Sequence, residues 1–265
     1  MLLRNVFTKT VRDLRWPTFW ISLGMAGMTG YFAVLFPTYS KIFNISDMLK
    51  KMGDAGKLFG VTGDATTLAG FLHIELFSMI LPALMVVLVA GMASGFTAGE
   101  ESRGTIDILL SYPISRRRMV LEKVLAVTLA AFAAAIAVWV FGLLGAAASA
   151  TALPADNLAA ALLMLVLLGL AFGAVALAIA AATGNRAASI GAAVGLLVVM
   201  YLVDAVSNIV DGLRTVQPLS LFHYYMGGDP LRNGVSLADA GVLSAVAIVF
   251  LAVALIAFER RDLAA

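Results

Sequence analysis

The chain has 265 residues, of which 62% are hydrophobic and 13% charged, and its formal net charge is +2. An average soluble domain carries roughly 25% charged residues, so this composition predicts a membrane protein rather than a soluble domain. The basic residues are divided among short segments instead of one patch, which argues against nucleic-acid binding. The sequence contains no cysteine, which excludes disulfides, thiolate metal sites and cysteine nucleophiles.

Residues 1–15 are predicted to form an amphipathic helix that lies on the bilayer surface. Leu3, Val6 and Phe7 share an apolar face, whereas the basic residues occupy the opposite face, where they would meet anionic headgroups. The alternative is a solvated positive flank of the first membrane span. The residues expected to anchor this region in the interface are Arg4, Arg12, Trp16 and Trp20.

Six apolar stretches are long enough to cross a hydrocarbon core of roughly 30 Å. They cover about residues 17–37, 71–97, 119–150, 158–182, 189–210 and 237–258. An even number of spans places both termini on one side of the membrane. Twelve of the eighteen Lys and Arg residues then share that side, which predicts that both termini are cytoplasmic.

Pairs of glycines four residues apart recur in the spans. They are Gly91 and Gly95, Gly169 and Gly173, and Gly191 and Gly195. Small residues at this spacing let helices approach closely, so the pairs predict either packing within the chain or a dimer seam.

A polar segment at 99–123 separates the second span from the third, and its sequence is GEESRGTIDILLSYPISRRRMVLEK. Residues 105–110 are predicted to form a short helix that exposes apolar side chains. Pro113 would end this helix, and Ser115 would cap the next one. An isolated helix of this length is unstable in water, and its apolar residues favour a partner surface. We interpret the segment as a docking element, the alternative being a basic topology anchor in which Arg117 and Arg118 lie at the lipid headgroups.

The polar segment resembles the loop that follows the second span in ABC-2 type permeases of ABC transporters. The matching positions are Glu100, Glu101, Gly104, Thr105, Leu109, Leu110, Pro113, Ser115, Arg116 and Lys123. Residues 218–234 are similar to the outer segment before the last span of that family, and 258–263 to its closing aromatic-x-Arg-Arg-Asp. The resemblance follows the whole chain in order.

The resemblance implies an all-α integral membrane protein with six spans, an N-terminal interfacial helix, a cytoplasmic coupling helix in the 99–118 loop, and short outer helices in a re-entrant segment at 211–236. The implied partners are two copies of an ABC ATPase subunit and a second permease, identical or homologous, in a prokaryotic cytoplasmic membrane. The residues implied to contact the ATPase are Glu100, Glu101, Gly104, Thr105, Ile106, Leu109, Leu110, Pro113, Ser115 and Arg116.

No phosphate-binding loop of the G-x-x-x-x-G-K-[ST] kind occurs in the sequence. We therefore expect no enzymatic activity and no cofactor bound by this chain, with ATP and Mg on the partner ATPase. The sequence also contains neither a G-x-S-x-G elbow nor an H-E-x-x-H helix.

Three polar residues in the spans are candidates for a substrate path or gate. They are His73 and Glu75 in the second span and Asp204 in the fifth. A carboxylate at membrane depth is a functional candidate by default, although Asp204 near an interface could simply reach water. His73 and Glu75 are two residues apart and do not share a helix face, so an interfacial position is the alternative for them.

The sequence thus favours a permease subunit of an ATP-driven exporter that moves an amphipathic or lipidic substrate by alternating access. One alternative is a stand-alone channel or secondary transporter, which would be expected to carry charged or unwound sites near the bilayer midplane. Another is a non-transporting scaffold or signalling component of an ATPase-linked complex.

Overall fold

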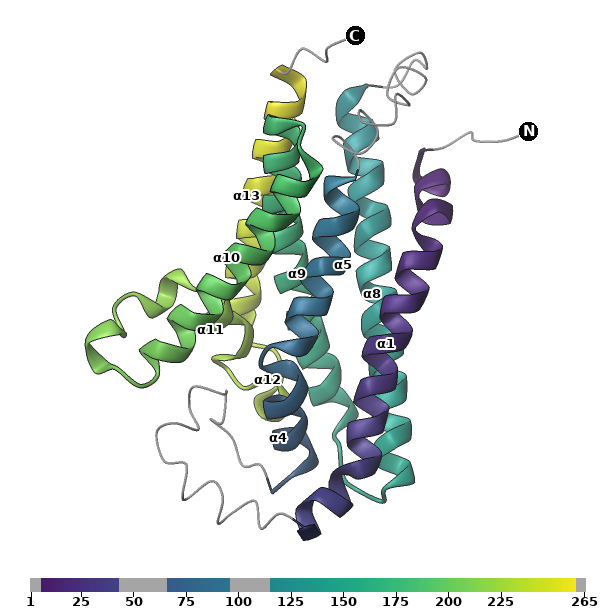
Figure 1. The fold of residues 1–265 in the computed structure, drawn as a ribbon, viewed down its shortest axis with the longest axis vertical. Helices are drawn as coiled ribbons and strands as arrows, with labels where there is room; N and C mark the ends of the chain where they lie inside the picture. The colour runs from purple at the N-terminus through teal and green to yellow at the C-terminus, as the bar shows by residue number, and fades with distance from the viewer. Residues whose placement is uncertain (1–5, 43–65, 96–114, 261–265) are drawn as a thin grey trace.

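The computed structural model describes residues 6–42, 66–95 and 115–260, and within these ranges every regular element is a helix. Figure 1 shows a bundle of long helices with shorter helices at one end. The long helices are α1 (Val6–Ile42), α5 (Ile80–Ser94), α8 (Arg116–Ala148), α9 (Ala155–Thr183), α10 (Arg186–Ser207) and α13 (Leu237–Arg260). The short helices are α4 (Leu68–Leu72), η1 (His73–Phe77), η2 (Asp211–Leu213), η3 (Gln217–Leu219), α11 (Leu221–Met226) and α12 (Pro230–Asn233).

The all-helical fold expected from the hydropathy is confirmed. In the described residues, five helices are long and apolar enough to cross a membrane, and α4–η1 with α5 makes a sixth if this bent pair is one span. The described ends of the chain, Val6 and Arg260, lie at the same end of the bundle (Figure 1). We call this end, where α1, α8 and α10 begin, the basic end, and the other the far end. The chain is therefore a multi-pass membrane protein.

The N-terminal region differs from the expectation of a separate interfacial helix followed by a span at residue 17. Helix α1 runs without interruption from Val6 to Ile42 and contains Pro17 and Pro37. A proline inside a helix removes one backbone hydrogen bond and crowds the preceding turn, which bends a helix more often than it ends one when the flanking residues are strong helix formers. Figure 1 shows the first turns of α1 continuing the line of the rest of the helix.

The second span is broken near its far end. Helix α4 continues into η1, a π-helical turn, and the axis then bends by 48° before α5. Pro82 has no N–H to donate to the carbonyl of Ser78, so the regular ladder cannot continue across this point. Ser78 N donates to His73 O at 2.8 Å, the i to i−5 bond of a π-helical turn. Pro82 lies in the first turn of α5, where a missing N–H is tolerated, so the break falls directly before the proline.

Helix α9 is the centre of the bundle and packs against α5, α8, α10 and α13. Two of its glycines explain how closely α5 approaches. A Cβ at Gly169 would lie 2.6 Å from Met85 Cγ, and one at Gly173 would lie 2.4 Å from Val89 Cγ1. This pair therefore serves packing within the chain, one of the two roles expected for it.

A second close contact joins α1 to α8. A Cβ at Gly145 would lie 2.7 Å from the backbone oxygen of Gly30, and one at Gly30 would lie 3.2 Å from the backbone oxygen of Phe141. Because the obstacles are backbone atoms, no side-chain rotation would relieve them. The two glycines bring α1 and α8 together along most of their length.

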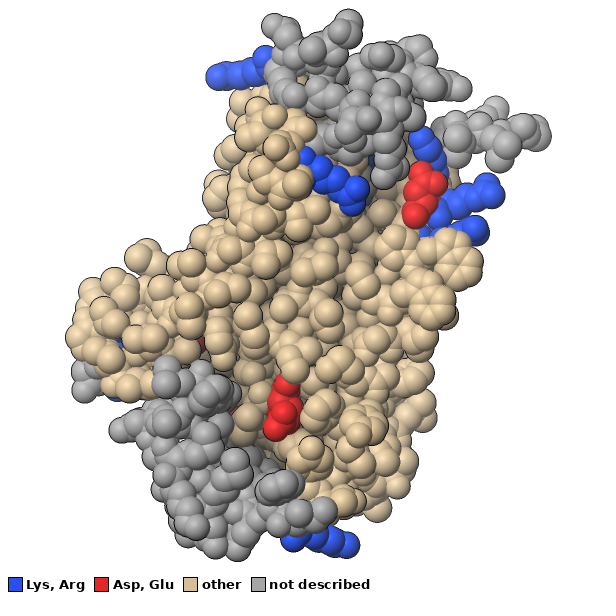
Figure 2. All heavy atoms as spheres, viewed as in Figure 1, with Lys and Arg blue, Asp and Glu red and all other residues tan. Residues whose placement is uncertain are grey.

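Charged side chains concentrate at the ends of the bundle. Figure 2 shows Lys and Arg gathered at the basic end, whereas the middle of the bundle on this face is almost entirely without charge. The described helices thus present an apolar belt between polar ends, as expected of a protein that lies in a bilayer.

Candidate functional site

A polar cavity of about 260 Å³ lies toward the far end, where the broken second span meets α10, α11 and the turn before α12. Five elements supply most of its polar side chains. They are His73 from η1, Asp204 and Asn208 from the end of α10, Gln217 and His223 from η3 and α11, and Asp229 from the turn before α12. The break in the second span forms part of the cavity wall. π-Helical turns of this kind are frequent at functional sites.

Asp204 is the centre of one hydrogen-bond network in the cavity. Gln217 Nε2 donates to Asp204 Oδ1 at 3.1 Å and to Asn208 Oδ1 at 3.0 Å. Asn208 Nδ2 in turn donates to the backbone oxygen of Asp204 at 3.0 Å. The carboxylate is thus held by amides from two elements, which lowers the cost of placing it away from bulk water.

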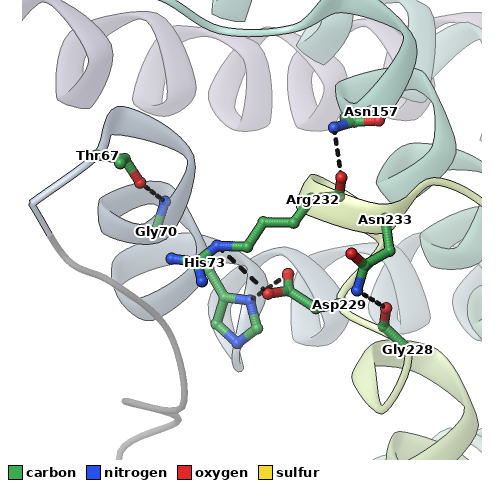
Figure 3. A network of polar contacts seen from close by, with 8 residues as sticks. All are labelled: Thr67, Gly70, His73, Asn157, Gly228, Asp229, Arg232 and Asn233. Atoms are coloured by element: carbon green, nitrogen blue, oxygen red, sulfur yellow. Dashed lines mark hydrogen bonds and ion pairs between the residues drawn. The ribbon is translucent and has the colours of Figure 1, made fainter.

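Asp229 is the centre of a second network in the cavity (Figure 3). Its Oδ1 lies 3.9 Å from His73 Nδ1, and its Oδ2 lies 3.5 Å from Arg232 Nε. Figure 3 shows the imidazole ring and the guanidinium group both directed at this carboxylate. The backbone oxygen of Arg232 accepts a hydrogen bond of 2.9 Å from Asn157 Nδ2 at the start of α9. This network joins η1, α12 and α9.

The backbone of Asp229 adopts a conformation that few residues tolerate. Its φ is +46°, in the left-handed region, where Asp and Asn are several-fold enriched among non-glycine residues. Such conformations cost of order 1 kcal/mol or more and persist only where surrounding contacts hold them. The contacts with His73 and Arg232 supply that support, so these contacts and the turn stabilise each other.

The floor of the cavity is fixed by the start of α11. Ser220 Oγ donates to the backbone oxygen of Met200 at 2.7 Å and accepts from Phe222 N at 3.1 Å. Tyr225 is fully buried, and within the described residues its hydroxyl has no hydrogen-bond partner. Burial raises the pKa of Tyr225 well above its ordinary value, so the phenol stays neutral and packs as part of the core.

The structure brings together two of the three residues expected to form a substrate path or gate. His73 and Asp204 both line the cavity, whereas Glu75 is not among its lining residues. Reasoning from the sequence missed Asn208, Gln217 and Asp229 as partners of these residues. Of these three residues, only Asp229 was marked in the sequence, because it is part of the Asp-Pro-Leu motif in the 218–234 resemblance.

Most residues expected to contact an ATPase lie outside the described residues, namely Glu100, Glu101, Gly104, Thr105, Ile106, Leu109, Leu110 and Pro113. Ser115 is described, and the expectation that it caps the next helix is confirmed. Its Oγ accepts a hydrogen bond of 3.3 Å from Arg118 N. Arg116 is the first residue of α8.

The residues expected to anchor the chain in the membrane are exposed where the structure describes them. The exposed fractions of Trp16 and Trp20 are 57% and 62%, Arg12 is also exposed, and Arg4 lies outside the described residues. Arg117 donates to both carboxylate oxygens of Glu259, with Nη2 2.8 Å from Oε2, and Arg118 Nε donates to Glu122 Oε1 at 2.9 Å. The first pair ties the start of α8 to the end of α13.

The polar cavity is not a metal centre of the usual kind. Among the described residues, no group of three or more His, Cys, Asp or Glu side chains could hold a metal ion.

Comparison with known proteins identifies the family. Residues 31–263 match the family model described as ABC-2 family transporter protein, and no curated protein matches the chain. The match includes every described helix from within α1 to the end of α13, and with them the polar cavity. This chain therefore belongs to the ABC-2 family of transporter proteins and is a transmembrane permease component.

Proposed function

We propose that the chain is the permease subunit of an ATP-driven exporter whose ATPase subunits are separate polypeptides. The observation that carries this proposal is the family match over residues 31–263, in a sequence that has no phosphate-binding loop of its own. The excess of Lys and Arg at the basic end favours a cytoplasmic position for this end, in a prokaryotic cytoplasmic membrane. The 99–118 loop would then face the ATPases.

The packing of the bundle supports a mechanical role for that loop, because it joins two helices that belong to different close-packed pairs. Helix α5 precedes the loop and packs on α9 through Gly169 and Gly173. Helix α8 follows the loop and packs on α1 through Gly145 and Gly30. Close-packed pairs move as units, so a push on the loop would displace one pair against the other.

A cavity lies between these pairs, and its lining favours an apolar or amphipathic substrate. It has a volume of about 180 Å³ and lies between α5, α8, α9 and α13. Its walls are almost entirely apolar, with Val89, Val127, Leu170 and Leu251 among the lining residues and Thr128 as the polar exception. Because this cavity lies between the α5–α9 pair and the α1–α8 pair, a displacement of one pair against the other would enlarge it into a path for the substrate.

The nucleotide cycle can drive this displacement only under one energetic condition. The ATP-bound ATPases must bind one packing of the permease more tightly than the other, since a partner with equal affinity for both packings shifts nothing. The coupling helix in the 99–118 loop would carry that difference in affinity. The polar cavity at the far end would act as a gate, because the Asp229 network in its wall joins the broken second span to α12 and α9.

Affinity purification from native membranes tests the partnership. The tagged chain is expected to copurify with a polypeptide that contains a phosphate-binding loop. Replacing Leu109 and Leu110 by Asp is expected to abolish copurification and leave membrane insertion intact, because it places charge on the apolar face expected to dock. The control is Leu219→Asp, a residue with 73% exposure between α10 and α11, which is expected to retain the ATPase. Equal recovery of the ATPase with the 109/110 variant would refute the docking role.

A further inference from the structure

A second polar cavity, of about 330 Å³, lies at the basic end between α1, α5, α8 and α10. Four charged side chains line it, and they come from three of these helices. They are Lys9 and Asp13 from α1, Lys123 from α8 and Arg186 from α10. With three cations and one carboxylate, the described lining carries a net positive charge.

The cations are held in place by the bundle. Arg186 Nη2 donates to the backbone oxygen of Gly91 at 3.2 Å, which fixes the guanidinium of α10 against α5. Lys123 is only 2% exposed, and Lys9 is half-buried. The neighbouring carboxylate of Glu122 is engaged elsewhere, because it accepts hydrogen bonds from Arg118 Nε and from the backbone N–H of Phe7.

The lining changes from charged to apolar with depth. On α1, Lys9 and Asp13 lie near the start of the helix, whereas Leu14 and Ile21 line the cavity farther into the bundle. The distance from Lys9 to Ile21 along α1 is about 18 Å, at roughly 1.5 Å per residue. The wall contributed by α5 carries no charged side chain, and Val87 and Leu88 line its part farthest from Gly95.

Open space adjoins the charged part of this cavity. A Cβ added at Gly91 would meet no atom within 4 Å, in contrast to Gly169 and Gly173, where it would overlap α5. Gly91 and Gly95 both line the cavity. Gly91 therefore leaves room beside the cations, whereas a Cβ at Gly95 would lie 3.2 Å from Met92 O and 3.9 Å from Arg186 Cζ.

We propose that this cavity binds the phosphate of an anionic glycerolipid, with the first part of an acyl chain along the apolar wall. A guanidinium and two ammonium groups are the donors that proteins use for phosphate, and basic pockets between transmembrane helices characteristically hold anionic lipid headgroups. A hydrophilic anion would satisfy the cations but gain nothing from the apolar wall. The joined polar and apolar parts therefore favour the phosphate of a lipid over free phosphate.

This inference goes beyond the proposed function and does not depend on it. Binding of a lipid requires neither the ATPase nor transport, so its test uses the purified chain alone. A failure to bind lipid would leave the ATPase partnership untouched, and a failure to recover an ATPase would leave the lipid site untouched.

Native mass spectrometry of the detergent-purified chain tests the proposal. Titration with phosphatidylglycerol is expected to give one tightly held lipid, whereas phosphatidylcholine, whose choline would meet the cations, is expected to bind at least tenfold more weakly. Lys9→Gln is expected to lower the affinity for phosphatidylglycerol about fivefold. The double variant Lys123→Gln with Arg186→Gln is expected to lower this affinity further, because each basic group near an anionic headgroup contributes a similar factor. The control Arg260→Gln removes a charge at the same end from an exposed residue that does not line the cavity, and it is expected to change the affinity less than twofold.

Gly91→Leu provides a variant that changes shape without changing charge. The open space at the Cβ position of Gly91 and the higher helix propensity of Leu predict a folded protein. The larger side chain is expected to occupy the cavity and lower the affinity for the lipid at least tenfold. Competition with inorganic phosphate distinguishes the source of the anion. The proposal is overturned if millimolar inorganic phosphate displaces the lipid completely, if phosphatidylcholine binds equally well, or if Lys9→Gln and Gly91→Leu bind as the wild type does.

Discussion

His73 Nδ1 lies 3.9 Å from Asp229 Oδ1, although the two residues come from opposite halves of the chain. The contact joins the π-helical turn of the second span to the start of α12. It continues through the backbone oxygen of Arg232 to Asn157 on α9. One carboxylate thus connects the broken span, the short helices and the centre of the bundle.

A double-mutant cycle with His73→Gln and Asp229→Asn measures the strength of this contact. The side chains are 8% and 28% exposed, so we expect a coupling energy of about 0.5–1.5 kcal/mol. Unfolding in SDS followed by circular dichroism provides the free energies. Asn at 229 tolerates the positive φ, so backbone strain does not enter the cycle. Zero coupling would show that the contact contributes nothing to stability.

Gly145→Ala is expected to destabilise the bundle by about 1–3 kcal/mol, the usual cost of overpacking. The new Cβ would lie 2.7 Å from the backbone oxygen of Gly30, and α1 would have to move away from α8. The matched control is Gly24→Ala on α1, where a Cβ meets nothing within 4 Å. This control is expected to stabilise the helix slightly, by up to about 1 kcal/mol. Opposite signs in the same unfolding assay support the close α1–α8 contact, and equal shifts would contradict it.

Asp204→Ala is expected to cost about 1–2 kcal/mol, because it leaves the half-buried amide of Gln217 with one acceptor fewer. Asp204→Asn retains a side-chain oxygen and should cost less. Asp156→Ala, at an exposed position near the start of α9, serves as the control and should stay within about 0.5 kcal/mol of the wild type. Thermal unfolding in detergent distinguishes the three variants. An Asp204→Ala protein as stable as the control would show that the Asp204 network does not stabilise the fold.

The absence of cysteine makes the topology directly measurable. Ser40→Cys and Ser115→Cys place single thiols at exposed positions near opposite ends of the bundle. In intact cells, a membrane-impermeant maleimide is expected to label Ser40→Cys at once and Ser115→Cys only after permeabilisation. The reverse pattern would place the 99–118 loop outside the cytoplasm.

Local signals in the sequence predicted the parts of the fold that depend on local physics. Hydropathy indicated where the long helices lie, and Ser115 was recognised as a cap because its role depends only on the next three residues. Pro82 marks a weak point of the second span in the sequence, but the π-helical turn before it depends on how the far end of the bundle packs. The continuity of α1 through Pro17 was missed for a similar reason, because packing against α8 stabilises a turn that proline weakens.

Contacts between distant residues could not be read from the sequence. Gly145 is packed almost as tightly as Gly169 and Gly173, but its partner Gly30 lies on another helix, so no spacing pattern marks this pair. The cavity residues His73 and Asp204 were recognised because polar groups are rare in apolar spans. Their partners Gln217 and Asp229 lie in a segment where polar residues are common, and only the folded chain distinguishes them.

Photo-crosslinking in native membranes tests the central claim most directly. A benzoylphenylalanine at position 109 should capture a polypeptide that contains a phosphate-binding loop, in an amount that changes when ATP is added, whereas the same group at position 219 should not. This result would place the energy source of the transporter at the loop between α5 and α8. If position 109 captures no ATPase, or if it is reached only by reagents from outside the cell, the claim that a separate ATPase drives this bundle is wrong.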